Sequence, residues 1–399
     1  MKYLFIAPID IYADASAGAE TINLYLKELS SMENEICVLA NSKGRYESDQ
    51  IKYIILEKDS EEIEKILKIQ KALGWIFYPQ NRYSYKTSGR LRKNIVLELQ
   101  RLKAEGYLPD VVMLETTSSI LLYRLVLDVF PNVKLVGSLH DISYQGSRRK
   151  MELETNALKY AIRKRYLKNA TKVEISALAQ MDLIAPHNAG NIGILREHLE
   201  LKEKKMFPLV PFYSCEYIHE DDKCNKDILF YGLMSRAENY QSAEWFIDHV
   251  IPRLPSEYRF IVMGGKPPKH LEEKASEKVI VTGFVDEVEV KNYFEHAFCI
   301  VVPLLFGSGI KTKVLTAMAS GLPVLTNEIG IEGIGAAPEI DYLHCEEPEE
   351  YVTGIEKLAN DHTVYKEICS NSRRFMNQNY NMKECAITYN KVLKQMIEN

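Results

Sequence analysis

Short apolar runs alternate with amphipathic helical stretches along most of the chain, and this alternation limits the fold more than any other feature of the sequence. The runs are mostly continuous, without interleaved polar residues, as expected for parallel strands that are covered on both faces. Between them, apolar residues recur three or four positions apart, for example at Ile22, Tyr25, Leu26 and Leu29. Alternating strands and helices of this kind form a parallel sheet with helices on both sides.

The strand-like runs fall into two series, one in each half of the chain. The first series is Tyr3–Ala7, Ile36–Ala40, Tyr53–Leu56, Val111–Leu114, Val133–Leu139 and Leu183–Ala185. The second series is Ile228–Tyr231, Phe260–Met263, Val279–Val281, Cys299–Val302, Pro323–Thr326 and Tyr342–Cys345. A length of 399 residues suits two domains of about 200 residues each. We therefore expect an α/β protein with two Rossmann-like, doubly wound domains that face each other across a cleft.

The pattern lapses between the two series. Pro208 and Pro211 are followed by the polar stretch Glu220-Asp-Asp-Lys223, which is typical of an interdomain linker. Beyond the linker, Ala243–Leu254 has the apolar spacing of a helix with one buried face. The predicted parts are an N-terminal domain over residues 1–208, a linker over 209–226, a C-terminal domain over 227–378, and a last helix within 379–399 that returns to the N-terminal domain.

Composition narrows the classes of function. A net charge of −5 gives no global basic field, so a nucleic-acid partner is not indicated. No apolar run reaches the roughly 18–20 residues that span a bilayer, and the start of the chain lacks the pattern of a signal peptide. The seven cysteines include no Cys-x-x-Cys pair, which fits reduced thiols better than a disulfide framework or a zinc site. We expect a cytoplasmic protein.

The strongest local signal is the segment Val301–Val324, which is typical of a strand, a glycine loop, a helix and a further strand. Gly307 and Gly309 leave out side chains where a ligand could approach the backbone, and the following helix presents free amides to an anion. Two cations in its first turn, Lys311 and Lys313, are disfavoured by the helix dipole by about 0.3–1 kcal/mol each. Since no acidic residue is close to them in sequence, a bound anion explains them; two solvated lysines after a tight turn are the alternative. The loop matches neither a Walker P-loop nor Gly-x-Gly-x-x-Gly.

This segment also carries a family resemblance. Gly307-Ser-Gly-Ile-Lys-Thr-Lys-Val-Leu-Thr-Ala-Met-Ala-Ser-Gly-Leu-Pro-Val-Leu-Thr326, with Ile329-Gly-Ile-Glu-Gly-Ile334 after it, resembles the donor-site signature of GT-B glycosyltransferases, especially the retaining, family-4-like group (glycosyl transferases group 1). Ile228-Leu-Phe-Tyr-Gly-Leu-Met-Ser-Arg-Ala-Glu-Asn239 is similar to the strand that opens the donor domain. Val262-Met-Gly-Gly265 and Val281-Thr-Gly-Phe-Val285 are similar to the next two strand ends. The resemblance runs from about 227 to 335.

The resemblance implies a nucleotide-sugar donor, such as a UDP- or GDP-sugar, as a substrate, with no cofactor. The residues implied to hold the donor diphosphate are Gly18, Arg236, Gly307, Ser308, Gly309, Ile310, Lys311 and Lys313. Those implied near the nucleoside and the sugar are Gly264, Gly265, Phe284, Val285, Thr316 and Glu332. Arg236 could instead be a solvated loop residue that binds no phosphate. Gly18 could instead belong to a plain turn between a strand and a helix.

Three positions depart from the family pattern. Thr316 stands where a glutamate would hold the ribose hydroxyls, and the earlier glutamate position, near Phe306–Ser308, has no carboxylate. The lysine usual after the first donor-domain strand is replaced by Ala237-Glu-Asn-Tyr240. Lys311 or Lys313 would then supply the missing charge. These three departures bear on which nucleotide-sugar the protein binds and, to a lesser degree, on whether it is catalytically active.

In the N-terminal half, His140-Asp141 follows the apolar run Leu135–Leu139, at the strand end where ligands bind. By resemblance, His140 contacts the transferred sugar, and Asp141 orients His140 or caps the next segment; we take both as catalytic. In retaining GT-B enzymes the departing phosphate assists the incoming hydroxyl, so the protein supplies orientation and charge stabilisation. With no Asp-x-Asp and no metal-ligand spacing, no metal is expected. For His187-Asn188, a structural role is favoured.

The remaining signals concern the acceptor. Trp75–Lys86, continuing to Arg90 and Lys93, mixes aromatic residues with cations and is a candidate contact for a sugar acceptor, a lipid headgroup or a partner protein. A solvated loop with a few buried aromatic residues is the alternative. The leading function is a glycosyltransferase of the hexosyltransferase type (EC 2.4) in polysaccharide biosynthesis, acting on a glycan, lipid-linked or protein acceptor. The alternatives are a catalytically weakened GT-B partner of another transferase and an NDP-sugar epimerase; a nicotinamide dehydrogenase lacks its fingerprint.

Overall fold

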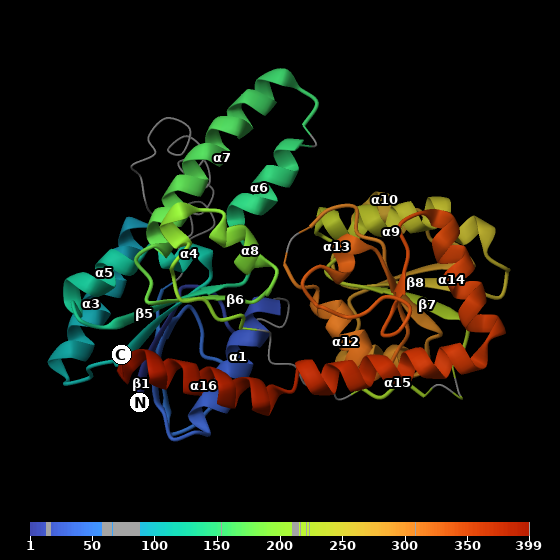
Figure 1. Cartoon of the computed structure of the whole chain (residues 1–399). Coiled ribbons are helices and arrows are strands. Elements are labelled where there is room, and N and C mark those ends of the chain that lie inside the picture. The colour runs from blue at the N-terminus through green and yellow to red at the C-terminus, as the bar shows by residue number, and fades with distance from the viewer. Residues whose placement is uncertain are drawn as a thin grey trace. The chain divides into compact units, whose positions relative to one another are not determined.

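The computed structural model describes residues 1–12, 17–57, 66, 88–152, 154–209, 215, 217–220, 222, 224–307 and 309–398. The chain forms two compact units: unit 1 is Met1–Phe212 with Met382–Asn399, and unit 2 is Tyr213–Asn381. Each unit is built on a six-stranded sheet in which all neighbouring strands are parallel (Figure 1). This confirms the predicted α/β fold class.

Unit 1 carries its sheet in the order β3-β2-β1-β4-β5-β6. The strands are β1 (Lys2–Ala7), β2 (Glu35–Ala40), β3 (Ile51–Ile55), β4 (Val111–Glu115), β5 (Lys134–Leu139) and β6 (Leu183–Pro186). The central strand β1 is buried from Tyr3 to Ala7, and its successive side chains enter the cores on opposite faces of the sheet.

Helices cover both faces of this sheet. They are α1 (Ala17–Ser30), α3 (Gly89–Ala104), α4 (Thr117–Ile120), α5 (Tyr123–Val129), α6 (Ser143–Glu152), α7 (Ala157–Leu178), α8 (Asn191–Arg196), the 3₁₀ turn η1 (Leu199–Leu201) and α16 (Met382–Glu398). The last helix, α16, packs beside α1, and its buried Asn390 Oδ1 accepts a hydrogen bond of 2.7 Å from Tyr3 Oη. By contrast, α6 and the first half of α7 project away from the sheet (Figure 1).

Unit 2 repeats the same plan. Its strands are β7 (Asp227–Tyr231), β8 (Arg259–Met263), β9 (Val279–Gly283), β10 (Cys299–Val302), β11 (Val324–Thr326) and β12 (Leu343–His344), in the order β12-β11-β10-β7-β8-β9. Its helices are α9 (Ala237–His249), α10 (Lys269–Glu272), α11 (Glu287–His296), α12 (Thr312–Ser320), α13 (Glu328–Ile331), α14 (Pro348–Asn360) and α15 (His362–Asn379), with the 3₁₀ turn η2 (Ile251–Arg253).

The strand order locates the ligand sites. In each unit the first strand lies between the second strand and the fourth, so the chain winds outward in both directions from one point. Doubly wound sheets bind ligands beyond the carboxyl ends of their strands at this switch point. In unit 1 the switch lies between β1 and β4, and in unit 2 between β7 and β10.

The predicted strands agree with the observed ones to within about two residues, whereas one helix boundary was wrong. The stretch predicted as a helix over Ala243–Leu254 is α9, which begins six residues earlier, at Ala237, and ends at His249. The first two residues that this helix buries, Asn239 and Ser242, are polar, so apolar spacing did not reveal its start. Pro252 lies in the separate turn η2, because proline cannot donate the backbone hydrogen bond that would continue the helix.

Two further observations concern the chain as a whole. No disulfide joins any of the seven cysteines, all of which lie in the described ranges. Among the residues that the structure describes, no helix combines the length and the apolar character needed to cross a bilayer.

Candidate functional site

The glycine loop of unit 2 joins β10 to α12 at the switch point of the sheet. Gly307 and Gly309 have φ values of 155° and 75°, in the region that favours glycine. Lys311 immediately precedes α12 in an extended conformation, and Ile310 is partly exposed. Ser308 lies outside the described residues. The loop therefore brings side-chain-free backbone to the amino end of α12, where helix amides favour an anion.

The Lys311 side chain folds back over this loop. Its Nζ donates to the carbonyl oxygen of Gly309 at 2.5 Å and lies 3.6 Å from Glu332 Oε2, just beyond α13. Only 9% of the Lys311 side chain is exposed. No carboxylate close in sequence balances the charge of Lys311, as predicted. Glu332, which is distant in sequence, does balance it, so a bound anion is not required to explain this lysine.

The Lys313 ammonium group is enclosed beside the first turn of α9. Its Nζ donates to the Oδ1 of Asn239 at 2.7 Å and lies 4.6 Å from the ring centroid of the buried Phe230. The position that a Cβ would take on Gly232 is 3.0 Å from the same Nζ. Lys313 therefore brings a cation from α12 to the segment after β7, where the family pattern has a lysine of its own. Of the two lysines that the sequence left open as replacements, Lys313 is the one whose Nζ contacts Asn239 in that segment.

The surroundings of Lys313 change its charge. Burial lowers its pKa from 10.5 to about 7; Glu238 raises the pKa, and the charges of Lys311 and Arg236 lower it. Lys313 is thus close enough to Lys311 and to Arg236 for their charges to disfavour its own. Arg236, just before α9, is exposed and lies 3.9 Å from Glu238. Such a cluster favours a multiply charged anion, which would relieve the repulsion.

The carboxyl ends of the neighbouring strands hold the residues predicted for the nucleoside. Gly264 donates to the carbonyl oxygen of Gly283 at 3.1 Å, and its φ is 147°. A Cβ on Gly264 would lie 1.7 Å from the carbonyl oxygen of Gly232. Close approach of two strand ends therefore requires this glycine, whatever ligand binds. Gly265 lies against the Cβ of Phe284, whose side chain is 84% exposed.

The other three residues predicted for the nucleoside and sugar are Val285, Thr316 and Glu332, and Glu332 is the carboxylate that pairs with Lys311. Val285 follows Phe284 beyond the end of β9 and is partly exposed. Thr316 lies on α12, and its Oγ1 donates to the carbonyl oxygen of Thr312 at 3.0 Å. Because this hydroxyl is bonded back to its own helix, Thr316 is a poor substitute for a carboxylate that accepts bonds from ribose hydroxyls.

Replacing Gly264 by alanine should destabilise unit 2 by about 3 kcal/mol or more, because the new Cβ would overlap a backbone oxygen and the residue would keep a positive φ. Gly335 is the matched control: its φ is 81°, but nothing lies within 4 Å of a Cβ there, so Gly335→Ala should cost only about 1 kcal/mol. Chemical denaturation of both variants measures the difference. Equal losses of stability would contradict the close approach at Gly264.

In unit 1, strand pairing brings three side chains to the carboxyl edge of the sheet. Glu115 is the last residue of β4 and is opposite Ser138 on β5, while Leu139 is opposite Pro186 at the end of β6. His140 and His187 are the next residues after these two strands. Residues far apart in sequence therefore meet because parallel strands end at a common edge.

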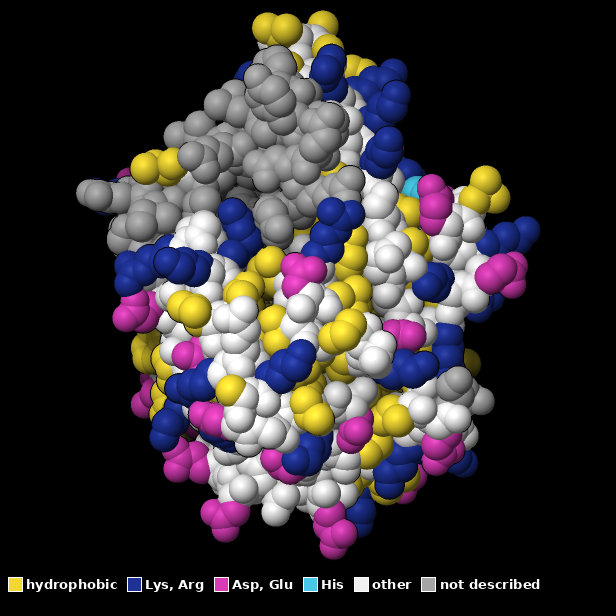
Figure 2. All heavy atoms as spheres, turned by 90° about the vertical axis from the view of Figure 1, so that its left-hand side faces the viewer, with side chains coloured by type: hydrophobic (Ala, Val, Ile, Leu, Met, Phe, Trp, Pro, Cys, Tyr) yellow, Lys and Arg dark blue, Asp and Glu magenta, His cyan; other side chains and the backbone are white. Residues whose placement is uncertain are grey.

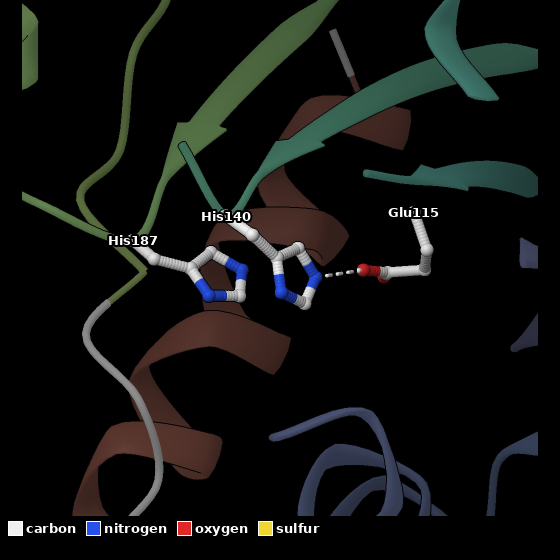
Figure 3. A group of neighbouring side chains, drawn as sticks. All are labelled: Glu115, His140 and His187. Atoms are coloured by element: carbon white, nitrogen blue, oxygen red, sulfur yellow. Dashed lines mark hydrogen bonds and ion pairs between the residues drawn. The ribbon is translucent and has the colours of Figure 1, made fainter. Parts of the chain in front are cut away.

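Figure 3 shows His140 between Glu115 and His187. The Nε2 of His140 is 3.3 Å from Glu115 Oε2, and its ring centroid is 4.1 Å from that of His187, with an interplanar angle of 32°. Glu115 is fully buried, and its Oε1 has no hydrogen-bond partner among the described residues. His140 is the most exposed of the three, with 18% of its side chain accessible. The two flanking groups thus hold an imidazole that solvent can reach.

The third member, His187, is held in the neutral state. Burial lowers its pKa well below the usual value, and the neighbouring His140 lowers it further. Its Nε2 is 3.0 Å from the Oγ of Ser138, and its ring has an edge contact with Tyr25 at 5.8 Å. The His187 ring lies against that of His140 at a tilt of 32°. His187 was assigned a structural role, and the sequence did not indicate its contact with His140.

The three side chains are also of the kinds that bind metal ions. Ligand atoms of Glu115, His140 and His187 lie within 4.8 Å of one another. In Figure 3 the His140 ring lies between the other two side chains, and its Nε2 is 3.3 Å from Glu115 Oε2. We derive no metal-dependent step from this group.

The remaining predicted residues of unit 1 are Asp141, Gly18 and the segment from Trp75 to Lys93. Asp141 is exposed and accepts hydrogen bonds from Thr117 Oγ1 at its backbone oxygen (2.7 Å) and at Oδ1 (3.4 Å); the carboxylate bonded to His140 is Glu115. Gly18 was predicted in a loop but lies in the first turn of α1, and the loop residues 13–16 are outside the described residues. Trp75–Lys86 is likewise outside them; Arg90 and Lys93 are exposed on α3.

Part of unit 2 is similar to a known protein family. Residues 225–361 match the sequence model of the glycosyl transferases group 1 family. The matched residues lie within unit 2, which is therefore similar to a group 1 glycosyltransferase domain. A curated relative, an uncharacterised 44.6 kDa protein in the cps region of Klebsiella pneumoniae, is 24% identical over 174 residues, which are 41% of this chain and 45% of that protein. The chain thus matches less than half of the length of this relative.

Solved glycosyltransferase structures share the fold of both units. Sucrose-phosphate synthase from Thermosynechococcus elongatus aligns over 100% of both chains, with a TM-score of 0.76 and 13% identity. TarM aligns over 98% of this chain and 99% of that chain, with a TM-score of 0.71 and 12% identity. HepE of Anabaena, solved in complex with UDP-glucose, aligns over 99% of this chain and 100% of that chain, with a TM-score of 0.68 and 12% identity. The fold is therefore that of the GT-B glycosyltransferases, as predicted.

The group 1 domain contains all the residues of the cation cluster. Arg236, Lys311 and Lys313 lie within the matched residues 225–361, as do the strand ends at Gly264 and Phe284. Asn239 and Phe230, which hold Lys313, were missed by the sequence analysis, although both lie in the segment that carried the resemblance.

Proposed function

We propose that the protein transfers a hexosyl group from a nucleotide-sugar to a hydroxyl group of a glycan, lipid-linked or protein acceptor in polysaccharide biosynthesis. The observation that carries this proposal is the cluster of Arg236, Lys311 and Lys313 around a glycine loop at the switch point of a group 1 domain. A nucleoside diphosphate has the charge to relieve the repulsion in this cluster. The solved complexes of HepE with UDP and with UDP-glucose support the same class of ligand.

Three cations also make a divalent ion unnecessary for the donor. Metal ions in many sugar and phosphoryl transferases neutralise the diphosphate, and guanidinium and ammonium groups can perform the same task. The base of the donor would lie against the exposed ring of Phe284, beside Gly265. We therefore propose transfer without a metal and with no cofactor besides the donor.

The chemical step that we propose keeps the configuration of the anomeric carbon. The bond from this carbon to the β-phosphate oxygen breaks, the bond to the acceptor oxygen forms on the same face, and the acceptor proton passes to the departing phosphate. His140, oriented by Glu115, would bind the hydroxyls of the transferred sugar. A cytoplasmic location at the inner face of the membrane would suit a lipid-linked acceptor.

Product analysis tests this function. The full chain is incubated with a panel of UDP- and GDP-sugars, with and without EDTA, and release of nucleoside diphosphate and free sugar is followed by NMR. We expect slow hydrolysis of at least one donor, an unchanged anomeric configuration in the first product and no effect of EDTA. Loss of turnover with EDTA, or an inverted product, would refute those parts of the proposal. Binding without turnover in the presence of candidate acceptors would favour the non-catalytic partner, and an epimerised sugar would favour the epimerase.

A further inference from the structure

The first half of α7 is exposed on all its sides. Every residue from 157 to 165 is exposed, whereas the second half of the helix packs into the core with Ala170, Val173 and Leu178. Figure 1 shows this half of α7 and its neighbour α6 projecting beyond the sheet of unit 1. A helix end that does not pack on its own domain either contacts another molecule or is solvated.

Large apolar side chains are part of this exposed end. The exposed fractions are 72% for Leu158, 43% for Ile162 and 39% for Tyr160. Leu158 and Ile162 are one turn apart on one side of the helix, and Tyr160 is on the opposite side. Exposed apolar residues that cluster at a projection favour contact with an apolar environment.

Cations surround these apolar residues. From residue 157 to residue 173 the sequence contains six Lys and Arg residues and no Asp or Glu, although the whole chain has a net charge of −5. Lys159, Lys164 and Lys168 are exposed, and Arg148 on α6 adds a further exposed cation. Arg163 forms an ion pair with Glu154 at 2.9 Å. Figure 2 shows dark blue and yellow side chains together at the projecting end of the molecule.

The distribution of these residues indicates the kind of partner. A partner with a groove would cover one stripe of the helix and leave Leu158 or Tyr160 in water, because they lie on opposite sides. A nucleic acid would use the cations but offers little to leucine and isoleucine. The interface of an anionic bilayer surrounds an inserted helix end, accepts apolar side chains and tyrosine rings, and attracts the lysines.

We propose that the projecting end of α6 and α7 docks on an anionic lipid bilayer, with Leu158, Tyr160 and Ile162 in the interface and the lysines beside the lipid headgroups. This surface gives a structural basis for the membrane-face location proposed above. This surface includes no residue of the glycine loop and does not include His140, so docking needs neither donor nor acceptor.

Sedimentation with lipid vesicles tests the docking. The full chain is mixed with vesicles of phosphatidylcholine alone, or of phosphatidylcholine with phosphatidylglycerol, in the absence of donor. We expect binding to the anionic vesicles only, weakened as salt shortens the screening length from about 8 Å at physiological strength to about 3 Å at 1 M. The triple variant Lys159→Glu, Lys164→Glu, Lys168→Glu should bind at least about tenfold more weakly, and Leu158→Ser with Ile162→Ser should also lose binding.

The matched control changes the same charge elsewhere in unit 1. Lys383, Lys391 and Lys394 are exposed on α16, and their replacement by glutamate should leave vesicle binding within about twofold of the wild type. Circular dichroism verifies that all variants fold. Equal loss in both triple variants, binding to neutral vesicles, or binding to heparin but not to vesicles would overturn the proposal. Since no donor is present, any of these results leaves the proposed sugar transfer to be judged by its own experiment.

Discussion

Replacing Lys313 by methionine is expected to weaken donor binding by about 10- to 100-fold and, without donor, to stabilise the protein at pH 7. The first effect follows from the loss of a charged donor to the diphosphate, worth about 1.5–3 kcal/mol. The second follows because the enclosed ammonium group is unfavourable in the folded state, as its pKa of about 7 indicates. Methionine fills a similar volume without a charge. After subtracting the lost hydrogen bond to Asn239, we expect the free energy of unfolding at pH 7 to rise by about 1–3 kcal/mol.

The lowered pKa of Lys313 also predicts in which direction stability and donor affinity change with pH. Between the folded pKa of about 7 and the unfolded value of 10.5, the unfolded chain holds more of the Lys313 proton, so this residue makes stability rise with pH across that window. A bound diphosphate favours the ammonium form, so donor binding should take up a proton above about pH 7 and weaken as pH rises. Both dependences should be smaller in Lys313→Met than in the wild type.

Calorimetric titration in buffers of different ionisation enthalpy measures the proton uptake, and denaturation at several pH values measures the stability. Lys291→Met is the control, because Lys291 is an exposed lysine on α11 that pairs with Glu295. It should change neither donor affinity nor the pH dependence. An unchanged affinity in Lys313→Met would exclude this residue from the phosphate site, and an unchanged stability profile would contradict the enclosed ammonium group.

Replacing His140 by alanine should lower kcat by about 100- to 1,000-fold with little change in the KM for the donor, because we place this side chain against the transferred sugar rather than the nucleotide. Glu115→Gln should lower kcat by about tenfold, since the amide keeps the size of the side chain but removes its charge next to the imidazole.

Asp141→Asn separates the two carboxylates that the sequence and the structure assign to His140. Because Asp141 contacts Thr117 rather than the imidazole, its effect on kcat should be smaller than that of Glu115→Gln. Steady-state kinetics with an active donor, together with long-range ¹H–¹⁵N NMR of the His140 tautomer, measure both effects. A larger effect of Asp141→Asn would restore the assignment made from the sequence.

The fold was predictable because its signals are local. Continuous apolar runs are typical of strands buried on both faces, and all six strands of each unit were found from them. The position of the glycine loop was predictable for the same reason, since a strand, two glycines and a helix follow one another directly. The start of α9 was missed because the first two residues that it buries, Asn239 and Ser242, are polar.

The arrangement of the site depends on contacts between distant residues, which no local pattern reveals. Glu115 meets His140 because β4 and β5 pair in register, and Lys313 meets Asn239 because β10 lies next to β7. One signal for Glu115 was present: it is a charged residue directly after an apolar run, at the carboxyl end of a strand beside the switch point. The predicted strand stopped one residue earlier, at Leu114, so the carboxylate was left out.

The central claim is that unit 2 binds a diphosphate through Arg236, Lys311 and Lys313. Its most direct test is calorimetric titration of the full chain with UDP and GDP and with the corresponding monophosphates. For the preferred base, we expect the diphosphate to bind at least about tenfold more tightly than the monophosphate, which is about 1.4 kcal/mol. This preference should disappear in the variant Arg236→Ala, Lys311→Ala, Lys313→Met. Equal affinities of the wild type for diphosphates and monophosphates, or a preference retained in the variant, would contradict the account.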